Sequence, residues 1–372
     1  MKSFILIITI IIVLQNVWVT INAETLNTSV LGIAPCMYSG DFDKHGTFCP
    51  YDPMPLNWIP KECTSFVFDG LICDSSFTFS FSKKDEKNVK ALGSSDKPLY
   101  LYYGYETPKA WIEAMNGTNT TNEAEQLKTF LSGFNVAGLI LKNLNYDYNS
   151  NLDYHFDECF YDNFKQYVTT MTTINSNLSI GLYVNASNMI FYSNNQVSPD
   201  WLQFSVLNDI MQYYIIGFDN FNPCNEYFKG GIVPNDNVLQ YNHSLSSFES
   251  ALSVSTIAKK KIYLEFLASP TVNDTTTEVL PTCCVTYKKF CESDHYNLFW
   301  CADNSDSFYK KGKFAREIKA QGIVTKYIDT IDPTAKCECN SDKFITFSMM
   351  LQGFLCEAPI ANCTKLNSVG LT

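Results

Sequence analysis

Arginine is almost absent from this chain of 372 residues: Arg316 is the only arginine among 27 basic side chains. Recognition by clusters of bidentate guanidinium groups is therefore excluded. Charged residues make up only 17% of the chain, and the net charge is -11. Such a surface repels phosphate backbones, and no lysine-rich stripe offsets the repulsion, so we expect no nucleic-acid partner. The hydrophobic content of 46% excludes a disordered chain and is sufficient for one large core or two ordinary ones.

Several sequence motifs of catalysis and cofactor binding are also missing. The chain contains no G-x-S-x-G nucleophile elbow and no glycine-rich phosphate cradle of the P-loop or dinucleotide type. Cys283-Cys284 and Cys337-Glu-Cys339 lack the paired spacing of zinc ligands, and the four histidines do not cluster with them. The sequence therefore predicts neither a cofactor nor a metal site.

The N-terminus carries the one long apolar segment. Lys2 precedes an apolar run at residues 4–14, and a second run ends before Asn22-Ala23, where a small residue suits signal peptidase. The alternative is a membrane anchor, but Gln15 and Asn16 interrupt the segment before it reaches the ~20 apolar residues that a span requires. We predict a signal peptide at residues 1–23, a secreted chain at 24–372 and no membrane span.

Because we expect the chain to be secreted, we expect its cysteines to form disulfides. All 14 lie after residue 23, and their even number is typical of a full set of disulfides, although composition alone pairs no two of them. Eight N-x-S/T sequons are consistent with a secreted glycoprotein, at Asn27, Asn116, Asn119, Asn177, Asn185, Asn242, Asn273 and Asn362.

Hydrophobic patterning predicts the fold class. Helical periodicity occurs at Ala124–Phe134, Phe160–Ile174 and Leu245–Ala258, between short runs rich in β-branched and aromatic residues. Eight such runs alternating with helices predict an α/β fold, a (β/α)8 barrel formed by one domain. The polar, cysteine-bearing segment at about 271–313 predicts a small insertion between the last two strands. The eight runs are Ser29–Pro35, Thr64–Ile72, Pro98–Tyr105, Val136–Leu144, Leu178–Val184, Tyr213–Phe218, Lys261–Ala268 and Gly322–Ile328.

Over nearly all of residues 24–372 the chain resembles glycoside hydrolase family 18, the chitinases and chitinase-like proteins. Val30-Leu-Gly-Ile-Ala-Pro-Cys36 is similar to the family's first strand, and the segment from Ile59 through Cys63 to the following Phe-Val-Phe-Asp-Gly is similar to the approach to its second strand. The resemblance implies a disulfide between Cys36 and Cys63. The insertion before the last strand also matches a subdomain that many members carry.

The fourth strand of the family carries the catalytic signature D-G-x-D-x-D-x-E. At its four carboxylate positions this chain has Ala137, Ile140, Lys142 and Leu144. In the family the Glu protonates the glycosidic oxygen, and the adjacent Asp orients the substrate's N-acetyl group. Leucine has no proton to donate. A lysine beside the developing oxazolinium cation would repel it, whereas the family's aspartate stabilises it. The resemblance therefore implies a protein that is not an enzyme.

A relocated acid is the alternative for catalysis. Asp147 is the nearest carboxylate, three residues beyond Leu144 and so roughly 10 Å farther along an extended chain, whereas a proton donor must lie within ~3 Å of its target. Asp153, Asp157 and Glu158 lie farther on, where the next helix is expected to begin, and we interpret them as helix N-terminal charges and solvated loop residues.

Other positions that contact substrate in the family also differ here. Ile216-Gly-Phe218-Asp219 keeps the Asp of the family's M-x-Y-D but has phenylalanine in place of the tyrosine. In the family a tryptophan on the last strand forms the floor of the sugar site. The corresponding residue here is Lys326, so the stacking surface for a pyranose is lost. The family's Ser-x-Gly-Gly on the third strand has become Tyr102-Tyr-Gly-Tyr105.

A polar set is left for the upper end of the barrel. Strand alternation directs Ile140, Lys142 and Leu144 inward, and Lys142 would share this end with other predicted site residues. One interpretation is a buried salt-bridge network that fills a lost active site; the other is affinity for an anionic or otherwise altered ligand. The candidate pocket residues are Tyr102, Lys142, Phe218, Asp219, Glu265 and Lys326.

The predicted function is that of a secreted, monomeric chitinase-like protein that binds chitin or N-acetylglucosamine oligomers, or a protein receptor. Two alternatives stay open: an active glycoside hydrolase with a relocated acid, and an effector or growth-factor-like protein with a protein partner and no affinity for sugar. The fold by itself does not choose among them.

Overall fold

The computed structural model describes residues 29–40, 54, 56–144, 155–195, 198, 200–238, 241, 243–272, 285–292, 300–332, 334–337, 339–340, 343–360 and 363–368. The predicted signal peptide lies outside these residues. No helix among them is long and apolar enough to cross a bilayer.

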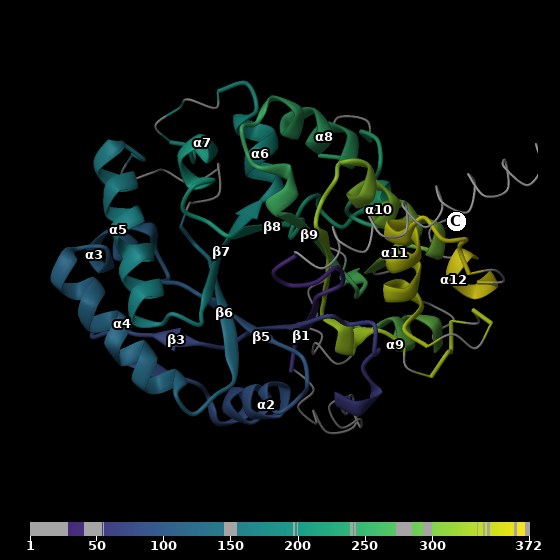
Figure 1. The fold of residues 1–372 in the computed structure, drawn as a ribbon. Helices are drawn as coiled ribbons and strands as arrows, with labels where there is room; N and C mark the ends of the chain where they lie inside the picture. Colours follow the sequence, from purple (N-terminus) through teal and green to yellow (C-terminus); the bar gives the residue numbers. More distant parts are fainter. Residues whose placement is uncertain are drawn as a thin grey trace, which may run out of the picture.

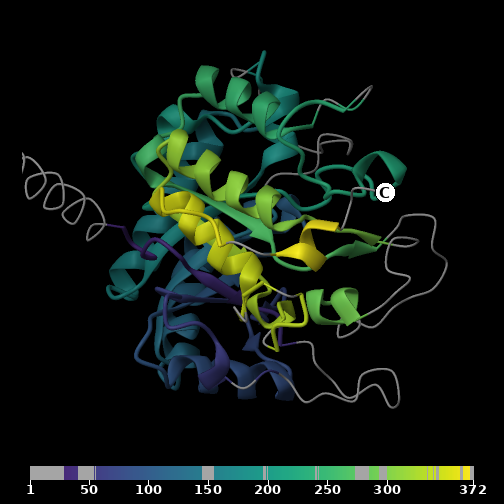
Figure 2. The same cartoon turned by 90° about the vertical axis from the view of Figure 1, so that its right-hand side faces the viewer.

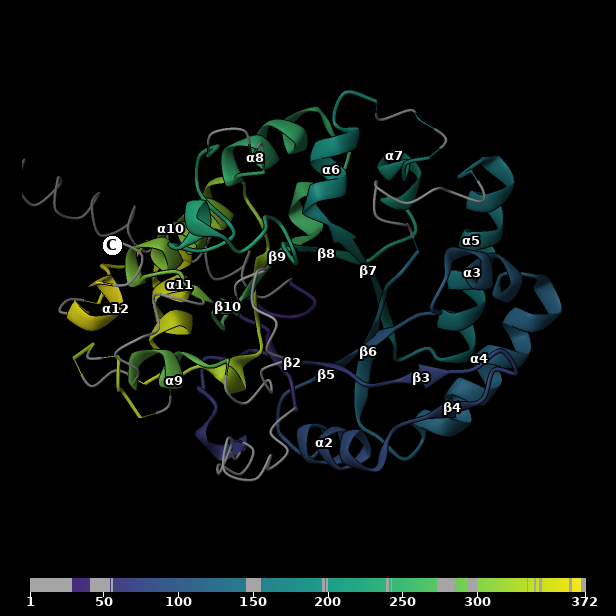
Figure 3. The same cartoon turned by 180° about the vertical axis from the view of Figure 1, so that it is seen from behind.

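Eight parallel strands close into a barrel, in the order β1-β12-β9-β8-β7-β6-β5-β2. Figure 1 shows the ring of strands surrounded by helices, and Figure 3 shows the same arrangement from behind. The predicted (β/α)8 barrel is confirmed. Its strands are β1 (Cys36–Tyr38), β2 (Phe66–Asp69), β5 (Leu99–Tyr103), β6 (Val136–Leu141), β7 (Ser179–Asn185), β8 (Tyr213–Gly217), β9 (Ile262–Leu267) and β12 (Gly322–Lys326).

Helices follow most of the barrel strands and cover the outside of the barrel. Their boundaries have local causes: Asp157 accepts from the Phe160 amide at the start of α5, and Ser244 forms a capping box at the start of α8. The helices are α2 (Lys83–Gly93), α3 (Pro108–Ala114), α4 (Gly117–Leu131), α5 (Glu158–Ile174), α6 (Ala186–Tyr192), α7 (Phe204–Leu207), α8 (Leu245–Val254), α9 (Tyr287–Glu292), α10 (Ser305–Glu317), α11 (Ile345–Leu355) and α12 (Thr364–Ser368).

The apolar side chains form two cores. The larger lies between strands and helices, and the smaller fills the barrel interior with Met37, Val67, Ile140, Val324 and several tyrosines. Interior tyrosines need partners for their hydroxyl groups. Tyr213 donates to the Leu139 carbonyl at 2.8 Å, for example, so the barrel interior is a packed core and not a channel.

The first strand begins later than the sequence pattern predicts. The prediction of Ser29–Pro35 was wrong, because the strand is Cys36–Tyr38. The carbonyls of Ile33 and Pro35 do accept hydrogen bonds from amides of β12. Proline, however, has no amide hydrogen to donate to the neighbouring strand on the other side. Hydrogen bonding to both neighbouring strands is therefore complete only from Cys36.

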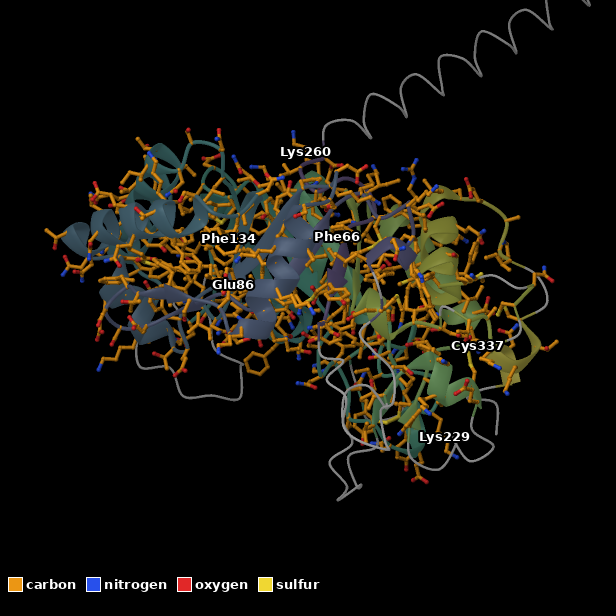
Figure 4. All side chains as sticks on the ribbon, turned by 90° about the horizontal axis from the view of Figure 1, so that it is seen from below. Phe66, Glu86, Phe134, Lys229, Lys260 and Cys337 are labelled. Atoms are coloured by element: carbon orange, nitrogen blue, oxygen red, sulfur yellow. A yellow bond between two sulfur atoms is a disulfide. The ribbon has the colours of Figure 1, made fainter. Side chains whose placement is uncertain are left out.

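The insertion predicted at about 271–313 falls on the segment between β9 and β12, of which residues 271–272, 285–292 and 300–313 are described. It contains the antiparallel pair β10 (Thr271–Val272) and β11 (Trp300–Cys301) and the short helix α9, which Figure 2 shows in light green, apart from the helices of the ring. Helix α10 begins at Ser305 and packs along α11 as a barrel helix, so the end of the predicted range overlaps this helix. The Lys229 carbonyl accepts from the Ala302 amide of this segment. Figure 4 shows Lys229 on the side of the molecule away from Lys260, which lies just before β9.

Disulfides join distant parts of the chain. One links Cys36 and Cys63, the pair that the resemblance implies. The others link Cys224 to Cys301, Cys291 to Cys337 and Cys339 to Cys363, and thereby tie the insertion and the C-terminal segment to the barrel. The expectation of a full set was wrong, because three described cysteines are free thiols: Cys73, Cys159 and Cys356.

Four of the predicted glycosylation sequons lie in the described residues. Asn116 and Asn177 are exposed. The amides of Asn119 and Asn185 already take part in local hydrogen bonds, to the Glu113 carbonyl and from the Ser187 amide respectively. The other four, Asn27, Asn242, Asn273 and Asn362, lie outside the described residues.

Candidate functional site

Polar side chains gather at the carboxyl ends of the barrel strands, which is the end where barrel enzymes place their active sites. Most belong to one group, which we call the Lys326 cluster. It is built from five strands or the residues directly after them, and consists of Tyr102 (β5), Tyr183 (β7), Asp219 (after β8), Glu265 (β9) and Lys326 (β12).

Lys326 is the centre of this cluster. Its ammonium group forms an ion pair with Asp219 and lies 3.4 Å from Glu265 Oε1. Tyr102 donates to Glu265 Oε2 at 2.5 Å, and Tyr183 donates to Asp219 Oδ2 at 3.1 Å. One ammonium and two phenols thus hold two carboxylates in fixed positions.

Burial and ion pairing act against each other on the pKa values of the cluster. The Glu265 side chain is 1% exposed, and burial raises its pKa, while the charge of Lys326 offsets part of that rise. Burial by itself would lower the pKa of Lys326, but the charges of Glu265 and Asp219 outweigh it and raise the pKa. Lys326 is therefore charged at neutral pH. Asp219, with 36% of its side chain exposed, is the more accessible carboxylate.

A second ion pair stands on the other side of the barrel mouth. Lys142 Nζ lies 2.5 Å from Asp69 Oδ1 at the end of β2, and their side chains are 25% and 40% exposed. The Lys142 backbone is held firmly: its amide donates to the Tyr103 carbonyl at 2.8 Å, and its carbonyl accepts from Trp111 Nε1 at 2.9 Å. We call Asp69 and Lys142 the Lys142 pair.

The predicted inward direction of Leu144 was wrong. Strand β6 ends at Leu141, and Asn143 adopts a left-handed conformation with φ of 58°. This residue interrupts the strand alternation, so the buried Leu144 joins the outer core. Ile140 does point into the barrel interior, and Ala137 packs against the apolar side chains of that interior core.

The predicted pocket residues divide accordingly. Tyr102, Asp219, Glu265 and Lys326 lie together, and Lys142 lies apart in its own pair. Phe218 is a correction: it belongs to the outer core, stacked on Phe266 with ring centroids 4.9 Å apart. Strand alternation could have warned of this, since Phe218 and Asp219 are neighbours and face opposite ways.

Sequence reasoning missed two members of the site. Asp69 ends the apolar run of β2 and Tyr183 lies near the end of β7, and both are polar groups at strand ends. A polar residue that ends a buried parallel strand was the available signal. Of the alternative acids, Asp157 caps helix α5, as interpreted, and Asp147 and Asp153 lie outside the described residues.

The described residues of the site offer groups for hydrogen bonding and form no arrangement typical of a metal centre. No group of three or more histidine, cysteine or carboxylate side chains that could hold a metal occurs in the described part of the chain. Among the charged side chains of the Lys142 pair and the Lys326 cluster, the accessible ones are Asp69, Lys142 and Asp219, which offer two carboxylates and one ammonium to a polar ligand.

Comparison with known proteins adds to this picture. The sequence matches no protein-family model and no curated protein. Solved structures do match. The group IV chitinase of Ostrinia furnacalis superposes with a TM-score of 0.66 at 14% identity, over 87% of this chain and 99% of that one.

The chain has a chitinase-like barrel fold. Human YKL-39, described as a pseudo-chitinase with retained chitooligosaccharide binding, superposes with a TM-score of 0.62 at 11% identity and covers 86% of this chain and 99% of its own. An immunomodulatory active chitinase from Trichuris suis superposes with a TM-score of 0.63 at 12% identity, over 87% and 99%. The fold is thus shared by active and inactive proteins, so the function has to be inferred from the residues of the site.

Proposed function

We propose that this protein is a secreted, catalytically inactive member of glycoside hydrolase family 18 that binds chitooligosaccharides at the barrel mouth. The observation that carries the proposal is the end of the fourth strand. Lys142 stands where the family has the orienting aspartate, and Leu144, where the family has its acid, packs into the outer core. Neither a proton donor nor an orienting carboxylate is offered from this strand.

Similarity to binding proteins supports the second half of the proposal. YKL-39 carries the description of a pseudo-chitinase that retains chitooligosaccharide binding. A Glu-to-Leu mutant of an Ostrinia furnacalis group II chitinase domain, which superposes at 13% identity, was solved in complex with (NAG)5. Replacement of a glutamate by leucine is therefore compatible with an oligosaccharide complex in that protein.

The charges at the mouth favour a neutral ligand over an anionic one. Both lysines of the described mouth already have carboxylate partners: Lys142 pairs with Asp69, and Lys326 pairs with Asp219 and Glu265. An anion would have to displace a carboxylate. Hydroxyl and acetamide groups, in contrast, can donate to Asp69 and Asp219 while both ion pairs stay intact.

Secretion is part of the proposal and rests on residues 1–23 together with the disulfides, which persist in oxidising compartments. Expression in insect cells and N-terminal sequencing of the secreted protein test this. A mature chain that begins at Glu24 is the expected result, and an uncleaved protein retained in membranes would contradict it.

Calorimetric titration with N-acetylglucosamine tetramer tests the binding site. We expect Lys142→Met to weaken the affinity of the wild-type protein about 5- to 10-fold, or roughly 1 to 1.4 kcal/mol. Lys90→Met is the matched control, because Lys90 forms an exposed pair with Glu86 on α2. Equal affinities for all three proteins would exclude the Lys142 pair from the site. No binding by the wild type, together with no retention on chitin beads, would favour a protein partner.

A relocated acid is the second candidate, and Glu265 is the residue that favours it. Its carboxyl group is buried at the barrel mouth, and its pKa is raised, as in a general acid. With 1% exposure, however, it is screened from substrate by Tyr102 and Lys326. Turnover of a fluorogenic chitooligosaccharide by the wild type and its loss in Glu265→Gln would support this candidate.

A further inference from the structure

Another buried carboxyl group, that of Glu123, lies outside the barrel, between helices and sheet. Glu123 of α4 is 0% exposed. Its Oε1 accepts from Tyr103 of β5 and, at 2.6 Å, from Tyr167 of α5. Its Oε2 is buried and has no hydrogen-bond partner among the described residues. A buried polar atom without a partner is costly, so the protonation state of this carboxyl group affects the packing of three elements.

The titratable groups that face Glu123 carry no compensating charge. They are the phenols of Tyr103, Tyr167 and Tyr105 and the thiol of Cys73 on strand β3 (Ile72–Cys73). Tyr105 links Tyr103 to Cys73, because its hydroxyl lies 3.4 Å from the Tyr103 hydroxyl and 3.8 Å from the Cys73 sulfur. Burial raises the pKa of Glu123 to about 7, although the phenol donors act in the opposite direction.

These aromatic residues also hold the turn that presents Lys142. Trp111 packs edge-on against Tyr103 and Tyr167, with ring centroids 5.9 and 5.7 Å apart. Its Nε1 donates to the Lys142 carbonyl, and the Tyr103 carbonyl accepts from the Lys142 amide.

The next residue of the turn is bound in the same way. Asn143 Nδ2 donates to the Tyr105 carbonyl at 3.1 Å. Three hydrogen bonds of the turn thus come from residues 103, 105 and 111, which pack around Glu123 or its phenol partners. This contiguous set of contacts joins the buried carboxyl group to the barrel mouth.

We propose that Glu123 is a positioning residue for the turn at residues 142–144, which is held firmly while the carboxyl group is protonated and loosened when it releases its proton to solvent. Ionisation puts a negative charge among rings and phenols with no cation beside it. Water entry or separation of α4 and α5 from β5 relieves that charge, and both displace Tyr103 and Trp111. The inference concerns the turn itself and holds whether or not sugar binds.

Hydrogen exchange of the amides in residues 142–144 tests the proposal in the full-length secreted protein. After correction for intrinsic exchange rates, we expect wild-type protection to fall about 10-fold or more between pH 5.5 and pH 8. Glu123→Gln keeps an oxygen acceptor for both tyrosines but cannot ionise, so its protection should stay constant. Glu125→Gln, an exposed change on the same helix, should behave as the wild type does.

Two outcomes would overturn the proposal: constant wild-type protection across this range, or the same decline in Glu123→Gln as in the wild type. A carbon-13 titration of the Glu123 carboxyl group in the wild type keeps the test decisive if the glutamine variant does not fold. Titration near pH 7 is expected, and titration near pH 4.5 would overturn the proposal. Because neither readout uses a ligand, failure of sugar binding and failure of this proposal are distinguishable.

Discussion

The two sides of the barrel mouth use the same chemistry at different depths. The Lys142 pair joins one ammonium and one carboxylate whose side chains are 25% and 40% exposed. The Lys326 cluster joins one ammonium and two carboxylates, and the side chains of Lys326 and Glu265 are 12% and 1% exposed. Water competes for the first pair. In the Lys326 cluster it reaches Asp219, whose side chain is 36% exposed, but it is largely excluded from Lys326 and Glu265.

This difference predicts different roles. An exposed ion pair contributes little to stability, and its polar atoms remain within reach of a ligand. A buried cluster is strongly destabilised when one member is removed, because the others keep their charge without compensation. We therefore expect the Lys326 cluster to maintain the barrel and the Lys142 pair to be available for recognition.

The largest expected effect is that of Lys326→Met. It leaves Glu265 and Asp219 without their ammonium partner, and we expect the free energy of unfolding to fall by about 3–5 kcal/mol. Urea denaturation followed by circular dichroism measures this. A loss below about 1 kcal/mol would show that the buried cluster is no more important than a surface pair.

The second effect concerns pH. Burial raises the pKa of Glu265 above its ordinary 4.5, so the native carboxyl group keeps its proton at a pH where the unfolded chain has released it. Stability should therefore fall as pH rises above 4.5 and through the raised pKa. Glu265→Gln should reduce this decline, as measured by denaturation across pH 4–8. If the free energy of unfolding of Glu265→Gln declined with pH as steeply as that of the wild type, the raised pKa of Glu265 would be contradicted.

A smaller effect is expected for Tyr102→Phe. The change removes the hydroxyl that donates to Glu265 Oε2 at 2.5 Å and keeps the ring. We expect a loss of about 1–3 kcal/mol in the free energy of unfolding. Tyr227→Phe, at a side chain that is 44% exposed, serves as the control and should be nearly neutral. Equal results for the two variants would be evidence against the hydrogen bond.

The smallest effect on stability is expected for Lys142→Met. Its pair with Asp69 is partly exposed, so the loss should stay below about 1 kcal/mol. The contrast with Lys326→Met, measured under the same conditions, is the quantity of interest. A loss as large as that of Lys326→Met would remove the distinction between the two sides of the mouth.

The barrel was predictable from the sequence because strand and helix periodicity are local signals. Most of the predicted strand runs contain the observed strand, as at Pro98–Tyr105, which contains β5 (Leu99–Tyr103). The first strand and Leu144 were exceptions with single-residue causes. Pro35 cannot donate to the ladder, and the left-handed Asn143 reverses the side of the residue that follows it.

The site was only partly predictable, because ion pairing depends on which strands become neighbours. From the sequence, Lys326, Asp219 and Glu265 could be placed at one end of the barrel. The ion pair between Lys142 and Asp69 could not be predicted. Glu123 was missed although it left a signal: it precedes Leu127 and Leu131 by four and eight residues, so a carboxylate stands in the apolar stripe of α4.

The most direct test is to measure hydrolysis and binding of N-acetylglucosamine tetramer on one preparation of the secreted protein. We expect binding in the calorimeter and no release of shorter oligomers above a heat-inactivated sample over a day. Release above that control by the wild type, abolished by Glu265→Gln, would contradict the claim that this barrel binds chitooligosaccharides without cleaving them.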